Sequence, residues 1–391
     1  MDFVCFASAY WYDPLWTNKQ HIMSRFAGRG HRVLYVPPGT SRRILRAWLR
    51  GDDPFNALWR WIRPERENLW RMVPLPLPLR QFEILKPLAW GLLARAVRSF
   101  LAHQGWDQPI LWIYHPEAAR VLDRIPARLV CYDCVDDFRT FPQYRNRQEA
   151  IAALEERILR RADLVFATSP ALCEAKRLLN PNTHLVPNVG DAEHFGKALL
   201  PETKVPDDLA RIPPPRIGFV GAVDDYKVDV GLLAQVAGAR PEWSFALIGP
   251  VGVAEKQSRL QPLRLPNVHL LGYRPYEMLP NYLKGMDVCI IPYAVTEHTA
   301  SVFPIKFFEF LASGKPVVVT PLPSLLPFRG AARIAEGAEA FVQAIAESLE
   351  RDTAEAKEVR LALARANTWD KRVDTLLSLV QDKIGTTNER K

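Results

Sequence analysis

Long apolar runs and paired cysteines are scarce in this chain of 391 residues. A bilayer-spanning helix needs roughly 18 or more nearly uncharged apolar residues in succession, and no such run occurs. The first ten residues, MDFVCFASAY, carry no basic residue, so we predict no secretory signal. The five cysteines are odd in number and lack the spacing of a disulfide framework, which is typical of reduced, intracellular proteins. We therefore expect a cytoplasmic protein.

Clustered metal ligands and a nucleic-acid-binding module are also lacking. Cys131 and Cys134 have a CxxC spacing, but they lie inside an apolar run that reads as a strand, which favours core cysteines over a metal or redox pair. We therefore expect no metal and no cofactor. The net charge of +8 favours anionic partners such as nucleotide phosphates, anionic lipid or nucleic acid. Nucleic acid fits least, because the arginines alternate with tryptophan and aspartate rather than forming a stripe.

Short apolar runs alternate with helical patterns along most of the chain, which predicts an α/β fold with parallel sheets covered on both faces. Residues 196–215 are rich in proline and lack periodicity, which is typical of a linker. We expect strands at 3–6, 33–36, 110–114, 129–134 and 164–167 before the linker, and at 217–220, 245–248, 268–271, 288–291 and 317–320 after it.

The pattern therefore predicts two Rossmann-like, doubly wound domains that face a cleft. The first domain spans 1–195 and the second spans 216–366, while 367–391 form a final helix that could cross back to the first domain. In such sheets ligands bind beyond the carboxyl ends of the strands, so we expect the functional residues in the loops that follow the strands.

An insertion at 42–100 departs from this alternation. Residues 42–71 hold eight arginines, four acidic residues and four tryptophans, and 84–101 form an apolar-rich helix with basic residues. Arginine with tryptophan suits the interface of an anionic membrane. A solvated insertion whose tryptophans pack on the domain explains the same composition, and both interpretations stay open.

Residues 296–319, TEHTASVFPIKFFEFLASGKPVVV, carry the most informative functional pattern. A polar loop leads into a short helix that ends at Gly314, and a buried strand follows. Lys306 and Glu309 are three residues apart, so they project from neighbouring positions of this helix. A cation near a helix N-terminus suits a phosphate, and a carboxylate one turn later suits two sugar hydroxyls. Together with Ile305 they outline a nucleotide-sugar site, whereas the alternative is a solvated pair on a surface helix.

Further donor-binding candidates follow other strands of the second domain. Gly221 ends a strand and would let the backbone approach phosphates at a strand-to-helix turn. Lys227 lies a few residues later, Gly249 follows the next strand, and Tyr273 and Arg274 follow the one after that. Plain structural turns and solvent-exposed side chains explain the same residues.

Candidates in the first domain also follow strands. The run 132–137, YDCVDD, brings three carboxylates to a strand end, which is costly unless they are hydrated, paired or used. Asp136 and Asp137 are cleft candidates, with helix capping as the alternative. His115 follows strand 110–114 and is a candidate base, and His21 in the first helix is a candidate contact to donor or acceptor. Histidines in such positions are more often hydrogen-bonded structural residues.

The chain as a whole resembles the GT-B glycosyltransferases, and most of all the bacterial group 1, family 4-like enzymes of polysaccharide or glycolipid assembly. The resemblance covers essentially the whole chain. The segments that carry it are NKQHIMSRFAGRGHRVLYV, RRADLVFATSPAL, HLVPNVGD, RIGFVGAVDDYKVD, LIGPVG, LGYRPYEMLPNYLKGMDVCIIPY and SVFPIKFFEFLASGKPVV.

Two positions depart from the family pattern. The family's paired glutamates, eight residues apart, would fall at 301 and 309, but position 301 is Ser301. The arginine that usually follows the glycine of the second domain's first strand is Ala222 here. Lys306 would supply the missing charge, and a lysine three residues before the ribose carboxylate is similar to glucuronosyltransferases of exopolysaccharide synthesis.

The resemblance implies transfer of a sugar from a nucleoside-diphosphate donor, with UDP favoured, to a hydroxyl of a lipid-linked or polysaccharide acceptor. The second domain would hold the donor, and the first would bind the acceptor and supply Asp136 as base. The resemblance implies no metal, and it suggests a peripheral position on the inner face of the plasma membrane. A sugar-nucleotide epimerase and a non-catalytic scaffold of the same fold are the alternatives.

Overall fold

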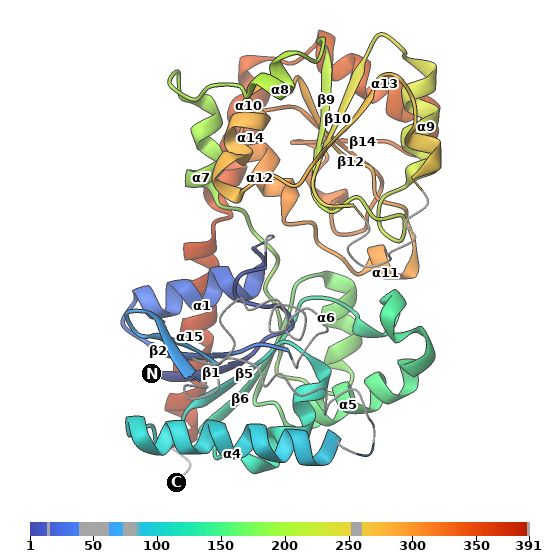
Figure 1. Ribbon diagram of the computed structural model, residues 1–391. Helices are drawn as coiled ribbons and strands as arrows, with labels where there is room; N and C mark the ends of the chain where they lie inside the picture. Colours follow the sequence, from blue (N-terminus) through green and yellow to red (C-terminus); the bar gives the residue numbers. More distant parts are fainter. Residues whose placement is uncertain (14–15, 39–61, 73–83, 85, 252–259, 389–391) are drawn as a thin grey trace, which may run out of the picture.

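The computed structural model describes residues 1–13, 16–38, 62–72, 84, 86–251 and 260–388. Predictions that concern 39–61 and 73–83, which include most of the arginine- and tryptophan-rich segment, lie outside the described residues. Within the described part, the chain forms two α/β domains stacked end to end, with the amino-terminal half below the carboxy-terminal half in Figure 1.

The first domain is built on an eight-stranded sheet with the order β3-β4-β2-β1-β5-β6-β7-β8. All neighbouring strands are parallel except the β3–β4 pair at one edge, which is an antiparallel hairpin. The strands are β1 (Asp2–Phe6), β2 (Arg32–Val36), β3 (Ile62–Arg66), β4 (Leu69–Met72), β5 (Ile110–Ile113), β6 (Leu129–Cys134), β7 (Leu164–Ala167) and β8 (Thr183–Leu185).

The second domain contains a six-stranded, fully parallel sheet with the order β11-β10-β9-β12-β13-β14. Its strands are β9 (Arg216–Val220), β10 (Ser244–Ile248), β11 (Val268–Gly272), β12 (Val288–Ile291), β13 (Val317–Val319) and β14 (Arg333–Ile334). The central strands of both sheets are mostly apolar, as expected of strands whose two faces are covered by helices.

The helices flank these sheets. They are α1 (Asn18–Gly28), α4 (Lys86–Gln104), α5 (Gln148–Arg161), α6 (Pro170–Arg177), α7 (Ala192–Gly196), α8 (Asp207–Ala210), α9 (Val230–Ala239), α10 (Leu279–Lys284), α11 (Glu297–Ala300), α12 (Lys306–Ala312), α13 (Gly337–Glu350), α14 (Ala354–Ala366) and α15 (Trp369–Asn388). Among the described helices, none has the length and apolar character needed to cross a membrane.

The last helix leaves the second domain and packs on the first. Trp369, Val373 and Leu376 of α15 are buried in the same core as Phe3 of β1 and Phe26 of α1. Figure 1 shows α15 running beside α1 along the first domain. On the opposite face of the first sheet, α4 and α5 cover a separate apolar core.

The segment that the sequence predicts as a linker, 196–215, is more ordered than its composition suggests. It contains α8, and Leu209 and Ile212 are buried in the core of the second domain. Leu209 reaches the bare backbone of Gly285, where an added Cβ would lie 2.6 Å from the leucine side chain. The prolines of 196–215 therefore belong to turns between short packed helices rather than to a flexible linker.

Candidate functional site

A cavity of about 310 Å³ lies between the two domains. It is lined by the segments that directly follow β1, β6, β9, β10, β11 and β12, so it lies where ligands bind in parallel sheets. Nine sequence-predicted residues line it, namely Asp136, Gly221, Lys227, Gly249, Tyr273, Arg274, Ile305, Lys306 and Glu309. The other three, His21, His115 and Asp137, are not among the residues that line it.

Two glycines keep the backbone open at one wall of the cavity. Gly221 has a φ of 153° and Gly249 has a φ of 148°, which are backbone conformations that residues other than glycine rarely adopt. A Cβ on Gly249 would lie 1.9 Å from the carbonyl oxygen of Gly221, and a Cβ on Gly221 would lie 2.0 Å from Cε of Lys306. The Lys306 side chain therefore extends across the bare backbone of Gly221.

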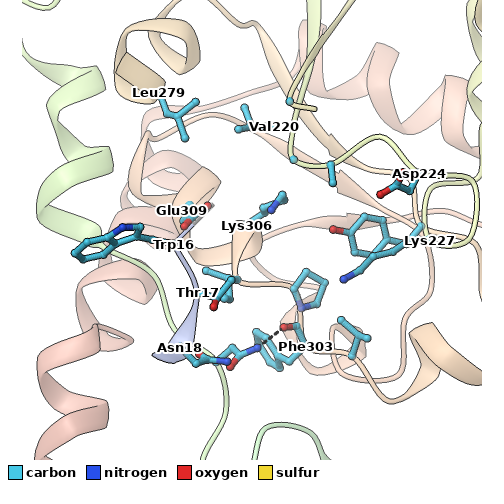
Figure 2. Close-up of a pocket in the computed structure, with 18 of the residues that line it drawn as sticks. Trp16, Thr17, Asn18, Val220, Asp224, Lys227, Leu279, Phe303, Lys306 and Glu309 are labelled. Atoms are coloured by element: carbon cyan, nitrogen blue, oxygen red, sulfur yellow. Dashed lines mark hydrogen bonds between the residues drawn. The ribbon is translucent and has the colours of Figure 1, made fainter. Parts of the chain in front are cut away.

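Lys306 and Glu309 both project from α12 into the site (Figure 2). Glu309 is only 7% exposed, and burial raises its pKa to about 7, although the Lys306 cation opposes this rise. Burial also lowers the pKa of Lys306, and the Glu309 carboxylate opposes that change. Both groups have lost much of their hydration. A polar ligand that replaces this water would stabilise their charged forms and so change both pKa values.

Two further lysines, the carboxylates of Asp136 and Asp224, and Arg274 complete the charged part of the cavity. Burial lowers the pKa of Lys227, and the nearby Asp136 carboxylate opposes this, while Lys306 and Lys19 lower it further. Burial lowers the pKa of Lys19 as well, with Asp136 again the strongest opposing charge. Lys19 comes from α1, and its Nζ lies 5.5 Å from the ring centroid of Tyr114. Cations from both domains thus surround Asp136, which is half-buried at the cavity wall.

Lys19 and Trp16 are cavity residues that the sequence analysis missed. Trp16 lies just before α1 and Lys19 lies in its first turn, where the Thr17 side chain and Gln20 form a capping box. The capping box was recognisable from sequence, and Lys19 lies within it, at the sheet edge where ligands bind. That position was the signal that could have identified Lys19.

Asp137 has a structural role beside the cavity. Its carboxylate accepts hydrogen bonds from the backbone N–H of Arg139 at 3.1 Å and from the Arg139 guanidinium at 2.6 and 2.9 Å. Burial would raise the pKa of Asp137, but the hydrogen bonds from Arg139 outweigh it and keep the pKa below the usual value. This matches the capping alternative for one of the two aspartates, and it leaves Asp136 as the carboxylate of this run that lines the cavity.

The geometry gives His115 no free basic nitrogen. The backbone N–H of Glu117 donates to Nδ1 of His115 at 3.1 Å, so the ring proton is on Nε2, which lies 2.7 Å from the hydroxyl of Tyr144. The arrangement is a helix cap that holds the loop after β5, because His115 precedes a 3₁₀ turn at Pro116–Arg124.

His21 is buried under the cavity wall rather than exposed in it. Its ring stacks on Trp369 of α15 at 4.6 Å between centroids, and Trp16 meets it edge-on at 5.3 Å. Burial lowers the pKa of His21 to about 3, so the ring is neutral at physiological pH. It connects α1 to α15 and is not among the residues that line the cavity.

The side chains of Ser301 and Arg274 form hydrogen bonds to other protein groups. Ser301 donates its hydroxyl to the carbonyl of His298 at 2.8 Å, and its own carbonyl accepts from the Ser169 hydroxyl at 2.7 Å. The guanidinium of Arg274 donates to Asp208 at 2.6 Å. Ser301 therefore joins the two domains, and Arg274 lines the cavity while its guanidinium is held by Asp208.

No group of three histidine, cysteine or carboxylate side chains is arranged to hold a metal within the described residues. The charged side chains at this site are three lysines, Arg274 and three carboxylates, and the glycine turns add backbone groups. Such a set can bind a diphosphate, hold vicinal hydroxyls and accept a proton.

Part of this chain matches a known protein family. Residues 214–351 match the family "Glycosyl transferases group 1". TuaH of Bacillus subtilis (strain 168), assigned to teichuronic acid biosynthesis as a glycosyltransferase, is 33% identical over 206 residues, which are 50% of this chain and 51% of TuaH. This chain thus aligns with about half the length of that relative.

Solved structures share the fold over nearly the whole chain. Sucrose-phosphate synthase from Thermosynechococcus elongatus has a TM-score of 0.73 at 16% identity, with 98% of this chain and 99% of that chain covered. Anabaena HepE in complex with UDP and glucose has a TM-score of 0.63 at 15% identity, with 97% and 99% covered. These similarities confirm the predicted fold of two Rossmann-like domains, which is the GT-B fold.

Proposed function

We propose that this chain, whose residues 214–351 form a group 1 glycosyltransferase domain, transfers a sugar from a nucleoside-diphosphate donor to a hydroxyl of a lipid-linked or polysaccharide acceptor. The observation that carries the proposal is the convergence of Lys306, Lys227 and Glu309 on one cavity beside the open backbone of Gly221. Two cations and bare backbone N–H groups suit a diphosphate, and a buried carboxylate suits the two hydroxyls of a ribose.

The donor would lie along the wall formed by the second domain. Glu309 would accept hydrogen bonds from the ribose hydroxyls, and Lys306 and Lys227 would neutralise the diphosphate. Tyr273 and the backbone of Arg274 would then contact the base. The bare backbone of Gly249, at the end of the neighbouring strand β10, would let the donor approach closely. UDP is our preferred nucleotide, and UDP is also the nucleotide in the HepE complex.

Asp136 would act as the base of the transfer. The carboxylate would take the proton of the acceptor hydroxyl while that oxygen attacks the anomeric carbon, and the bond from this carbon to the diphosphate oxygen would break. Lys306 and Lys227 would stabilise the negative charge that collects on the leaving diphosphate. Lys19, from the same domain as Asp136, would keep a positive charge close to this carboxylate, since Asp136 is the strongest charge that opposes the lowering of the Lys19 pKa by burial.

The transfer is tested with purified protein, a set of UDP-sugars and a lipid extract that contains lipid-linked saccharides. We expect release of UDP together with a product enlarged by one sugar in mass spectrometry. Asp136→Asn should lower turnover by at least about 10²-fold, the scale of general-base loss, whereas Asp123→Asn, at an exposed aspartate paired with Arg157, should leave it unchanged. Full turnover by Asp136→Asn would remove this residue from the mechanism.

A non-catalytic scaffold is the second candidate, and the orientation of Ser301 favours it. The residue that stands at the family's first glutamate position donates its hydroxyl to the carbonyl of His298, and it is not among the residues that line the cavity. UDP release without any acceptor product would point to hydrolysis, and conversion of the UDP-sugar to an isomer without UDP release would point to epimerisation. A folded protein that leaves every nucleotide sugar unchanged would support the scaffold.

A lipid-linked acceptor suits one face of the first domain. On α4 and just before it, Ile84, Leu88 and Leu92 are exposed at spacings of four residues, and exposed Arg95 and Arg98 follow them. Figure 1 shows α4 on the side of the first domain that faces away from the second. We infer that this face rests on an anionic membrane, because apolar side chains flanked by arginines match the interface of such a bilayer.

A further inference from the structure

Arg372 of α15 is the centre of a buried polar cluster behind the cavity. It is 3% exposed, and its Nη1 donates to the side-chain oxygen of Asn18 at 2.9 Å and to that of Asn188 at 2.8 Å. Its Nη2 donates to the carboxylate of Asp133 at 3.3 Å. One side chain near the end of the sequence therefore joins the start of α1, the end of β6 and the segment that leads from the first domain into the second.

Each of these partners supports an element that forms the cavity. Asn18 is the first residue of α1, and it precedes Lys19. Asp133 lies three residues before Asp136 in the same strand end. Asn188 uses its remaining side-chain group, the amide N–H, to donate to the carbonyl of Phe303 at 2.7 Å, the bond drawn as a dashed line in Figure 2.

The bond from Asn188 to Phe303 crosses from the first domain to the second. Phe303 lies three residues before Lys306, in the loop that carries the chain into α12. Because Arg372 occupies the oxygen of the Asn188 side chain, the amide nitrogen is forced to point at Phe303. Arg372 thus fixes the orientation of the Asn188 side chain, which holds Phe303 from the first domain as Ser169 holds the neighbouring Ser301.

Burying a guanidinium costs free energy, because the charged group loses its water. Burial raises the pKa of Asp133, and Arg372 is the strongest opposing influence. Buried ion pairs add little net stability compared with apolar side chains of the same size. The cluster instead fixes the relative positions of its members. The Arg372 guanidinium can bond to Asn18, Asn188 and Asp133 at once only when their three backbone segments are correctly placed.

We propose that Arg372 is a positioning residue that sets how the donor loop at 302–306 meets the acceptor-side residues Lys19 and Asp136. It touches neither substrate, and it acts through Asn188 and Asn18. The proposal rests on the proposed transfer reaction. It goes beyond that reaction by assigning the alignment of the two domains to a side chain of the C-terminal helix.

Arg372→Met tests this role, because methionine keeps an apolar stem and removes the guanidinium. We expect turnover to fall about 10- to 100-fold, since a misplacement of about 1 Å at reacting groups has this scale. The dissociation constant for UDP should change by less than about threefold, because the donor contacts lie in the second domain. Arg372→Lys should restore part of the turnover.

Two further variants separate positioning from stability. Asn188→Ala removes the bond to Phe303 but keeps the Arg372–Asp133 pair, and Arg372→Met in that background should cause little further loss of turnover. Arg360→Met is the matched control. Arg360 is also a buried arginine, and it donates to Asp352 and to the Gly314 carbonyl at a place that does not line the cavity. It should lower the melting temperature while the folded protein keeps its turnover. Additive losses for Arg372 and Asn188, or equal losses for Arg360→Met, would overturn the proposal.

A measurement that needs no activity keeps this proposal separate from the proposed function. Spin labels on Ala150→Cys of α5 and Ala340→Cys of α13, both at exposed sites, report the distance between the domains. We expect a single narrow distance distribution in the otherwise unaltered chain and a broader one with Arg372→Met. An unchanged distribution in the folded variant would contradict the positioning role, whereas absent turnover in the unaltered chain would contradict only the transfer reaction.

Discussion

At the scale of single residues, burial controls the charge of the groups that line the cavity. Glu309 has its pKa raised to about 7 by burial, whereas burial lowers the pKa of Lys306 and of Lys227. A carboxyl with such a pKa changes charge near neutral pH, where an exposed glutamate is fully ionised. Binding of a ligand that needs the carboxylate should therefore depend on pH in this range.

The pH dependence of uridine binding tests the role of Glu309. Uridine has the ribose but no phosphate, so the ligand itself does not titrate near pH 7. The ionised carboxylate accepts hydrogen bonds from both ribose hydroxyls, so binding should be strongest above the pKa and weaken as pH falls through about 7. At pH 5.5 the affinity should be lower by up to about 30-fold if only the ionised form binds, as measured by calorimetry.

Glu309→Gln is the control for this titration, because glutamine is similar in size and does not ionise. Its affinity for uridine should be low and nearly constant from pH 5.5 to pH 8. A variant that keeps the full pH dependence would show that another group titrates, and the assignment of Glu309 to the ribose would then be wrong.

Residues in short motifs were predictable, and residues joined over long distances were not. Lys306, Glu309 and Gly221 follow directly from strands and turns that the local pattern identifies. Arg372 and its partner Asn18 are 354 positions apart in the sequence, and a polar residue on an amphipathic helix gives no sign of such a contact. Buried charge that depends on tertiary packing is therefore the part of the site that one sequence does not reveal.

At the scale of elements, the order of strands and helices was predictable because both sheets are parallel and their strands are continuous apolar runs. The edge of the first sheet was not predicted. β3 and β4 form an antiparallel hairpin there, and Trp70 of β4 packs edge-on against Phe100 and Trp106. For this tryptophan the packing alternative applies, while the other three tryptophans of 42–71 lie outside the described residues.

Helix α4 carries a testable prediction about membranes. Arg95→Glu combined with Arg98→Glu should reduce co-sedimentation with anionic vesicles by at least about tenfold, because each basic residue near such a surface contributes about 1 kcal/mol. Binding of the unaltered chain should also weaken as salt is added. The measurement is the bound fraction with vesicles that contain phosphatidylserine or phosphatidylglycerol, compared with neutral vesicles.

The matched control reverses two exposed arginines of the second domain, Arg351→Glu and Arg365→Glu, which gives the same net charge. This control should bind vesicles nearly as well as the unaltered chain. Equal loss in both double variants would mean that overall charge, and not the α4 face, drives the association. Failure of the unaltered chain to bind anionic vesicles at low salt would remove the membrane contact.

At the scale of the whole molecule, the cavity exists because two domains meet. The first contributes Lys19 and Asp136, the second contributes Lys227, Lys306 and Glu309, and α15 connects the second domain back to the first. The sequence predicted both sheets and the cleft between them. It did not predict how the helix at 369–388 fastens the domains, because that depends on contacts between the two ends of the chain.

The most direct test of the account is calorimetric titration of UDP into the unaltered chain and into Lys306→Ala and Glu309→Ala. The account predicts one UDP site per chain and at least about tenfold weaker binding in each variant, since each loses a charged hydrogen-bonding partner of the ligand. Glu350→Ala, at an exposed glutamate of α13, should bind UDP as the unaltered chain does. Unchanged affinity in both cavity variants would contradict the assignment of this cavity to the donor nucleotide.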